Sequence, residues 1–270
     1  MVPHIYILKI HYILSMNQDC ILCPTGFAAN MALMVAVGDV SLLLNAGLQP
    51  LEVEKVAIFS DALNHSSIID RICLVKKQTG VKVFVYRHWD MFHLDELLSK
   101  CSMKKKVVVT DSVFSTGGDF APMHELARLR KKHGYLLAHG TFVCGKNCGG
   151  VAEAFNCDGD VDICDGTLSK AAGCQGEFII CRYHFRILEN QKILKTCLIL
   201  FSNSCFLLNI WYPNRILLYY TAAVDVARKE VWIRWKIWKM VKEFQVLTGN
   251  SNSQSYNLSD FRQGKESPGS

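Results

Sequence analysis

Apolar runs of strand length alternate with helical patterns between residues 23 and 182. Short apolar runs bounded by turns predict buried strands, and apolar positions that recur every three or four residues predict amphipathic helices. The predicted strands lie at residues 56–59, 81–86, 106–110, 135–137 and 161–164, and the predicted helices at residues 28–37, 66–77, 94–100 and 123–133. Strands that alternate with helices in this way favour an α/β fold with a mainly parallel sheet flanked by helices.

Polar segments follow four of the predicted strands. They lie at residues 61–65, 111–115, 139–141 and 165–170. In a mainly parallel sheet, ligands bind beyond the carboxyl ends of the strands. We therefore expect the functional site along that edge of the sheet.

The rest of the chain has a different character. Residues 183–220 are rich in large apolar side chains, contain no glycine and show no clean period, whereas the last residues are polar. We divide the chain into residues 1–22, an N-terminal segment without matching motifs; 23–182, the large domain; 183–220, an irregular apolar segment; 221–249, a long helix; and 250–270, a disordered tail.

The long helix carries tryptophans at a spacing of three residues, at Trp232, Trp235 and Trp238. Apolar side chains at helical spacing are more often a packing face than a ligand site. We expect this tryptophan stripe to be buried against the rest of the protein.

Composition excludes several classes of protein. The net charge of +6 is spread over short runs, which does not predict a nucleic-acid surface. The 12 cysteines show no disulfide framework, and Cys20 and Cys23 form a pair without a second pair to complete a metal site. This cysteine usage indicates a reducing compartment, the cytoplasm, and no leader or targeting signal is evident in the first residues. The apolar run at residues 197–212 falls short of the roughly 20 residues that span a bilayer.

Three motifs occur in a characteristic order. They are residues 60–70 (Ser-Asp-Ala-Leu-Asn-His-Ser-Ser-Ile-Ile-Asp), 111–122 (Asp-Ser-Val-Phe-Ser-Thr-Gly-Gly-Asp-Phe-Ala-Pro) and 166–173 (Gly-Thr-Leu-Ser-Lys-Ala-Ala-Gly). Together they resemble the α-oxoamine synthase family of pyridoxal-phosphate enzymes. Further segments, at residues 23–30, 139–145, 149–153 and 226–230, are similar to the plant members of that family that act in biotin biosynthesis.

The resemblance implies a fold, a cofactor and a reaction. The fold would be the large domain of fold-type-I pyridoxal-phosphate enzymes, as in aminotransferase class I/II proteins, and the cofactor pyridoxal 5'-phosphate. The reaction would be the decarboxylative condensation of L-alanine with a pimeloyl thioester, performed by a homodimer. Two alternatives stay open: a non-catalytic relative that binds cofactor or pairs with an intact subunit, and a membrane-associated fragment.

The resemblance also assigns roles to individual residues. Lys170 would condense with the cofactor aldehyde and move protons at the substrate, because a lysine amine can be both a nucleophile and a base. His65 would stack on the cofactor ring. Lys170 and His65 would together be the catalytic residues. Asn64 and Asp111 would support the site. The implied cofactor-binding set is Gly26, Phe27, His65, Ser115, His139, Thr167 and Lys170. Without the resemblance, Lys170 would be a solvent-facing lysine, and His65, Thr25 and Thr167 would be helix or turn caps.

The sequence also departs from the family pattern. The carboxylate that pairs with the cofactor's ring nitrogen is missing, because Leu137 runs directly into Ala138 and His139. Glu177 stands where the family has glycine, and Asp165 replaces an apolar residue. Family segments are also missing before residue 20, at residues 183–220 and after residue 249. We therefore expect a truncated and partly degenerate member with impaired activity.

Overall fold

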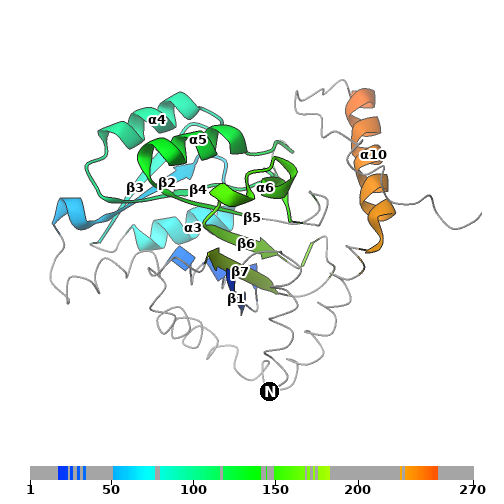
Figure 1. Cartoon of the computed structure of the whole chain (residues 1–270), viewed down its shortest axis with the longest axis horizontal. Helices are drawn as coiled ribbons and strands as arrows, with labels where there is room; N and C mark the ends of the chain where they lie inside the picture. The colour runs from blue at the N-terminus through cyan, green and yellow to red at the C-terminus, as the bar shows by residue number, and fades with distance from the viewer. Residues whose placement is uncertain are drawn as a thin grey trace, which may run out of the picture.

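The structure is a computed structural model of the 270-residue chain (Figure 1). It describes residues 18–23, 25, 26, 29, 30, 33, 34, 51–76, 80–115, 118–140, 144, 149–167, 169, 170, 173, 176–182, 226 and 229–248. For residues 18–23, 54, 138–140, 181, 182 and 245 it describes the backbone alone. Residues 183–220 and 250–270 lie outside the described residues, so the expectations for them, including a membrane-associated segment, stay predictions.

Seven strands form one sheet with the order β1-β7-β6-β5-β4-β2-β3. The neighbours from β6 to β3 pair in parallel, whereas β7 is antiparallel to both β6 and β1. The predicted α/β fold with a mainly parallel sheet is therefore confirmed. The strands are β1 (Gln18–Cys23), β2 (Val56–Asp61), β3 (Val81–Tyr86), β4 (Lys105–Val109), β5 (Leu136–Gly140), β6 (Ile163–Thr167) and β7 (Glu177–Arg182).

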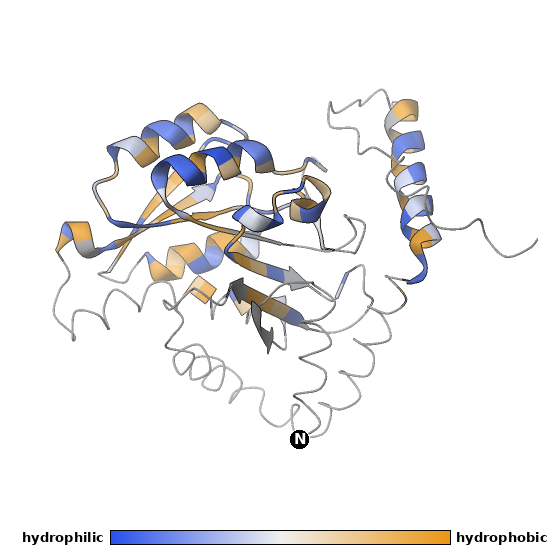
Figure 2. Ribbon diagram, viewed as in Figure 1, coloured by the Kyte–Doolittle hydropathy of each residue, from blue (hydrophilic) through white to orange (hydrophobic). Residues whose placement is uncertain are grey.

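Helices cover both faces of the sheet (Figure 1). The helices are α3 (Ser66–Val75), α4 (Met91–Lys100), α5 (Met123–His133), α6 (Val151–Ala154) and α10 (Val231–Thr248), with 3-10 turns at Glu52–Glu54 and Asp158–Asp160. One core lies under α4 and α5 and the other under α3 and the helical residues that follow Gly26. The central strands are hydrophobic and the covering helices are banded with hydrophilic residues, as Figure 2 shows.

Strand β2 explains how the two cores are separated. All its residues are buried. Ala57 and Phe59 belong to the core under α4 and α5, and Val56 and Ile58 belong to the other. Successive side chains of a strand point to opposite faces, so a continuous apolar run suits a strand that is covered on both sides.

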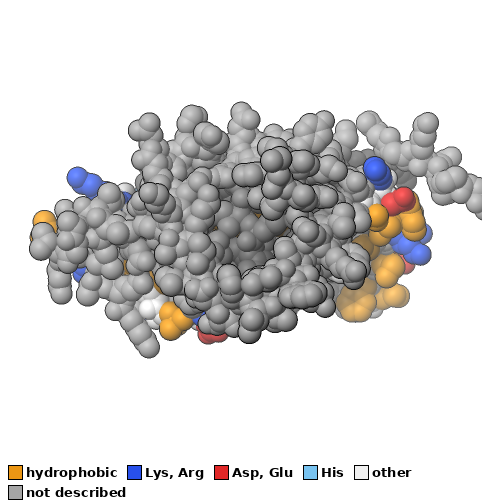
Figure 3. All heavy atoms as spheres, turned by 90° about the horizontal axis from the view of Figure 1, so that it is seen from below, with side chains coloured by type: hydrophobic (Ala, Val, Ile, Leu, Met, Phe, Trp, Pro, Cys, Tyr) orange, Lys and Arg blue, Asp and Glu red, His pale blue; other side chains and the backbone are white. Residues whose placement is uncertain are grey.

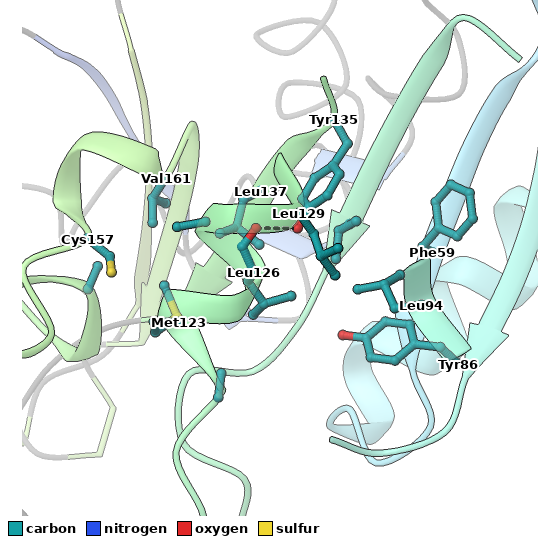
Figure 4. Close-up of a cluster of buried hydrophobic side chains, with 14 of the residues drawn as sticks. Phe59, Tyr86, Leu94, Met123, Leu126, Leu129, Tyr135, Leu137, Cys157 and Val161 are labelled. Atoms are coloured by element: carbon teal, nitrogen blue, oxygen red, sulfur yellow. Dashed lines mark hydrogen bonds between the residues drawn. The ribbon is translucent and has the colours of Figure 1, made fainter. Parts of the chain in front are cut away.

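The core under α4 and α5 also contains a polar group that is satisfied. Tyr135 is buried there, and its hydroxyl donates to the carbonyl of Leu126 at 2.6 Å (Figure 4). The bond ties the strand side of the core to α5. A buried hydroxyl without such an acceptor would cost on the order of 1–3 kcal/mol.

Most of the predicted boundaries differ from the structure by a few residues, and three differences bear on the site. Helix α4 begins at Met91 instead of residue 94, because the Asp90 carboxylate accepts a hydrogen bond from the backbone of His93 at 2.8 Å and caps the helix. Strand β6 begins two residues later than predicted and continues into Thr167, so the lysine motif starts inside the strand. Strands β1 and β7 were not predicted as strands at all. The strand at residues 81–86 and the helix at residues 123–133 are as predicted.

Helix α10 shows that the tryptophan stripe is not one packing face. Trp238 packs against Phe120 with 5.7 Å between ring centroids, but Trp232 is 54% exposed and Trp235 38%. Steps of three residues fall about 60° short of a full helical turn, so the three side chains drift around the helix. Hydrophobic side chains of α10 consequently reach the surface, at the right of Figure 3. None of the helices described is long and apolar enough to cross a membrane.

Candidate active site at the carboxyl edge of the sheet

The polar segments meet where the sequence predicts. Asp61 ends β2, Thr167 ends β6, and Asp111 lies two residues beyond the end of β4. Because β6, β5, β4 and β2 are neighbours and parallel, their carboxyl ends share one edge of the sheet. This edge is the candidate site.

Asn64 ties the ends of β2 and β4 together. Its side-chain amide donates to the hydroxyl of Ser60 and to the carbonyl of Val109, both at 2.9 Å. Its side-chain oxygen accepts from the backbone N–H of Asp111, also at 2.9 Å. The side chain is only 4% exposed, and its hydrogen bonds hold the two strand ends together. Its supporting role in the site stays a prediction.

His65 lies at the start of α3 and caps it. The Nδ1 atom accepts from the backbone N–H of Ser67 at 3.2 Å and lies 2.8 Å from the Ser67 hydroxyl. The His65 backbone N–H donates to the Asp111 carboxylate at 2.6 Å. The histidine is therefore a helix cap, and its exposed ring is held at the edge of the sheet. Capping leaves the ring faces available for stacking, so the predicted role of His65 stays a prediction.

The helical residues that follow Gly26 reach the same place from another part of the chain. Asn30 is buried, and its amide donates to the Ser67 hydroxyl at 3.3 Å. The carbonyl of Thr25 accepts from the backbone of Ala29 at 3.0 Å, as in the first turn of a helix. The turn at Gly26 is thereby placed near His65. Phe27 lies outside the described residues.

Lys170 is exposed in the turn that follows β6, and its carbonyl accepts from Gly173, which has a φ of 60°. Its charge acts on two carboxylates. Burial raises the pKa of Asp111, and the positive charge of Lys170 partly counters that shift. Lys170 counters the raised pKa of Glu177 in the same way. The predicted catalytic lysine therefore lies within electrostatic reach of the ends of β4 and β7.

Glu177 lies next to both parts of the predicted phosphate site, the Gly26 turn and Thr167. It is the first residue of β7 and pairs with Thr167 on β6 and with Cys23 on β1. A Cβ atom added to Gly26 would lie 3.1 Å from the Glu177 carboxyl carbon, and closer still to Oε2. The side chain is 5% exposed. Burial raises its pKa to about 7, while Lys170 and a hydrogen bond with Thr167 act in the opposite direction.

Asp165, on the neighbouring strand β6, is a second carboxylate in addition to Glu177. It stands at the position where the family pattern has an apolar residue. Burial raises its pKa to about 8, and the negative charges of Glu177 and Asp111 add to the shift. Two carboxylates that share a small space cannot both ionise freely. At neutral pH this pair therefore tends to retain a proton.

Two predicted cofactor contacts are only partly described. Ser115 is exposed in a turn, where the N–H of Gly118 donates to the carbonyl of Phe114 at 2.8 Å. The backbone of His139 lies in β5, paired with Cys164, and its side chain is not described. Their roles stay predictions.

The other carboxylates near β5 have partners of their own. Asp162 is bound by both Nε and Nη2 of Arg130, at 2.8 and 2.5 Å, and it also accepts from the backbone of Leu137. Asp160 lies 3.9 Å from Arg130 and 3.5 Å from Lys131. Neither is free to replace the carboxylate that the sequence lacks before Ala138.

His88 lies beyond the end of β3, at the same edge of the sheet, and was not among the predicted site residues. Its Nδ1 lies 3.0 Å from the Asp61 carboxylate, and its Nε2 lies 3.5 Å from the Asp119 carboxylate, too far for a good hydrogen bond. Its ring meets Phe114 edge-on at 4.5 Å. The signal was present, because residues 87–90 follow β3 as the other polar segments follow their strands.

A comparison with protein-family models matches residues 18–206 to aminotransferase class I and II. The match covers more than half of the chain. The chain belongs to the aminotransferase class I and II family. The resemblance inferred from the three motifs is confirmed.

Relatives within this aminotransferase family were found both by sequence and by structure. The chain is 57% identical over 240 residues to 8-amino-7-oxononanoate synthase of Arabidopsis thaliana, covering 87% of this chain and 48% of that protein. It is similar to a serine palmitoyltransferase solved with pyridoxal phosphate, with a TM-score of 0.66 and 22% identity over 87% of this chain and 53% of the other. It is also similar to 8-amino-7-oxononanoate synthase of Francisella tularensis, with a TM-score of 0.58 and 21% identity over 90% of this chain and 65% of the other.

The two structural likenesses show the fold, which is that of fold-type-I enzymes within the aminotransferase family. The chain spans about half the length of the plant relative that it matches. The activity of the whole relative is therefore taken up as a proposal.

Proposed function

We propose that the chain carries the cofactor-binding half of a pyridoxal-phosphate-dependent acyltransferase of the 8-amino-7-oxononanoate synthase type. The observation that carries the proposal is the convergence of Lys170, His65 and the Gly26 turn on one edge of the sheet. The high identity to the plant relative supports the choice of this enzyme among the family. The substrates would be L-alanine and a pimeloyl thioester, and the protein would act in the cytoplasm as a homodimer.

The part of the site around Lys170 fits the aldehyde group of the cofactor. Lys170 presents its amine to solvent at the carboxyl edge, beside the Asp111 carboxylate that also accepts from the backbone of His65. Asp111 thus links the lysine to the residue proposed to stack on the ring. When bound, the cofactor supplies an aldehyde for attachment and a ring that withdraws electrons from the substrate.

Two features of the site do not fit the cofactor. The ring nitrogen lacks a permanently ionised carboxylate, because Asp162 is engaged by Arg130 and Asp165 has a pKa of about 8. At the other end, the Glu177 carboxylate lies against the Gly26 turn that would hold the phosphate. We infer from these features that the chain attaches the cofactor aldehyde but catalyses the condensation poorly.

Covalent trapping tests the lysine assignment. Full-length chain is mixed with pyridoxal phosphate, reduced with borohydride, digested and analysed by peptide mass spectrometry. We expect the adduct on Lys170, and its loss in Lys170→Ala. Lys104→Ala, which removes another exposed lysine, is the matched control and should leave the adduct in place. An adduct of equal yield in Lys170→Ala would contradict the proposal.

Turnover tests the reaction. With alanine and pimeloyl thioester, we expect condensation to be slow or absent even when the cofactor is attached, because the missing carboxylate cannot hold the ring nitrogen in its protonated form. Carbon dioxide release and thiol release are the measurements. Rapid release of both by the purified chain would show that the ring does not need that carboxylate here.

A second candidate is a non-catalytic relative that binds cofactor and pairs with an intact subunit. The missing carboxylate favours it. Co-expression with the intact plant relative distinguishes the candidates: a pairing subunit would co-purify with the relative, whereas the first candidate would purify as a dimer of itself.

A further inference from the structure

The phosphate end of the candidate site holds an acidic side chain that the proposed function does not use. Glu177 is buried at the start of β7, next to Thr167 on β6. Its carboxyl group lies against Gly26 so closely that even one added carbon on the glycine would collide with it. The backbone at Gly26 and the hydroxyl of Thr167 are the groups that would otherwise face a phosphate.

We propose that Glu177 is a specificity-determining residue, which occupies the phosphate-binding turn and makes the site discriminate against phosphate-bearing ligands. The inference rests on the proposed function, because Gly26 and Thr167 form a phosphate site only if the chain binds this cofactor. While the carboxylate is ionised, the site takes pyridoxal, the aldehyde without a phosphate, in preference to pyridoxal phosphate.

Charge and space both act in this direction. A phosphate dianion placed at the Gly26 turn would lie within a few ångströms of the Glu177 oxygens, where like charges repel strongly in a partly desolvated site. The described positive charge that faces Glu177 is Lys170, and that amine is consumed when it attaches to an aldehyde. Asp165 on β6 stays mostly protonated at neutral pH, because burial raises its pKa to about 8, so Glu177 supplies the negative charge near the turn. Attachment of either aldehyde therefore leaves the Glu177 carboxylate unbalanced at the end where only pyridoxal phosphate carries its charge.

The repulsion between Glu177 and a phosphate at the Gly26 turn also depends on pH. Below about pH 7 the Glu177 carboxyl becomes neutral, since burial raises its pKa to about 7. Repulsion of the phosphate then falls, while the space that the side chain takes is unchanged. The groups that face it among the described residues are Lys170, Thr167 and Asp165, and each is retained when glutamate is replaced by glutamine.

The test compares two aldehydes and three proteins. Dissociation constants of pyridoxal phosphate and pyridoxal are measured by fluorescence titration for the full chain, Glu177→Gln and Glu177→Gly. We expect pyridoxal phosphate to bind about tenfold more tightly to Glu177→Gln, and more tightly again to Glu177→Gly. Pyridoxal should change by less than about threefold. In the unaltered chain the preference for pyridoxal should weaken from pH 8 to pH 6, and Glu177→Gln should lose this dependence.

Glu153→Gln is the matched control, since Glu153 also contacts a glycine turn, accepting from the backbone of Gly149 at 2.7 Å. It should leave both dissociation constants unchanged. Equal binding of the two aldehydes by the unaltered chain and by both Glu177 variants would overturn the inference. An equal gain for pyridoxal and pyridoxal phosphate would do the same, because the side chain would then exclude any ligand and select none.

Inorganic phosphate separates this inference from the proposed function. Its binding is followed by phosphorus NMR and does not need Lys170. If no aldehyde attaches to Lys170 in any variant, the proposed function fails, yet a gain of phosphate binding in Glu177→Gln alone still supports the role of Glu177. No gain of phosphate binding in either Glu177 variant, with both folded by circular dichroism, would overturn it. If Glu177→Gly does not fold, Glu177→Gln decides.

Discussion

The two sides of the candidate site differ in how their buried polar groups are paired. At the ends of β2 and β4, Asn64 makes three hydrogen bonds and joins the strands. On β6 and at the start of β7, Asp165 and Glu177 bring two acidic groups together, and both have raised pKa values. The first side satisfies its polar groups within the protein, whereas the second side depends on protons or on Lys170.

This difference teaches which part of the site is structural and which part is adjustable. Buried polar groups that are fully paired hold one geometry, because any change leaves a donor or acceptor unsatisfied. Buried carboxylates with few partners can change charge with pH at little geometric cost. The first side should therefore govern stability, and the second side should govern which ligand binds and at what pH.

Removal of the Asn64 amide should have the largest effect on stability. Asn64→Ala leaves the N–H of Asp111 and the carbonyl of Val109 without their partner. We expect a loss of about 3 kcal/mol in the free energy of unfolding, measured by urea denaturation. Ser102→Ala, at an exposed position, is the control and should change stability by less than about 0.5 kcal/mol. A loss no larger than the control's would mean that the two strand ends do not depend on Asn64.

The pH dependence of stability should come mainly from the second side. The pKa values of Asp165 and Glu177 are raised from 3.8 and 4.5 to about 8 and about 7, so the folded chain binds more protons than the unfolded chain between those limits. Stability is therefore lost as pH rises from about 4 to 8. Allowing for the partial exposure of Asp165, we expect the loss between pH 5 and pH 8 to be about 2–3 kcal/mol.

The double variant Asp165→Asn with Glu177→Gln is the direct check on this pH dependence. Urea unfolding at pH 5, 6, 7 and 8 should give a flatter profile than that of the unaltered chain. An unchanged profile would place the titrating groups elsewhere in the protein.

The smallest expected effect is a gain of stability beyond the end of β3, next to the first side. Trp89 follows His88 and has a φ of 62°, a left-handed conformation that bulky residues rarely adopt. Asparagine adopts it at lower cost, so Trp89→Asn should raise the free energy of unfolding by about 1 kcal/mol. Asn156, with a φ of 53°, offers the reverse comparison, since Asn156→Trp should lower it. A loss of stability in Trp89→Asn would show that ring contacts, such as that with His88 at 6.3 Å, outweigh the strain.

The sequence predicts the local elements of this fold better than the long-range pairing. Periodicity locates β3 and α5 to the residue. Strand β7 was not among the predicted strands, although residues 178–181 form a short apolar run. Its pairing with β1, which joins position 177 to position 23, is a long-range contact that local periodicity does not report. The position of Asp61, Asp111 and Thr167 at the ends of parallel strands was predictable from chain order.

The approach of Glu177 to Gly26 was not predictable in the same way. It depends on the register in which Cys23 pairs with Glu177, and neither the direction nor the register of that pairing is written in either segment alone. A substitution at position 177 was visible in the sequence. Its consequence became visible only once β7 was paired with β1.

The order of strands has a consequence for how the chain assembles. Strands β2, β3 and β4 come from one stretch of about 50 residues, so they close short loops and can form early. The pairing of β1 with β7 joins position 23 to position 177, and it can form only after nearly all of the sheet is in place. During synthesis, the Gly26 turn can therefore contact Glu177 only after β7 has left the ribosome. The turn proposed to hold the phosphate and the acidic side chain against it then come together in the same folding step.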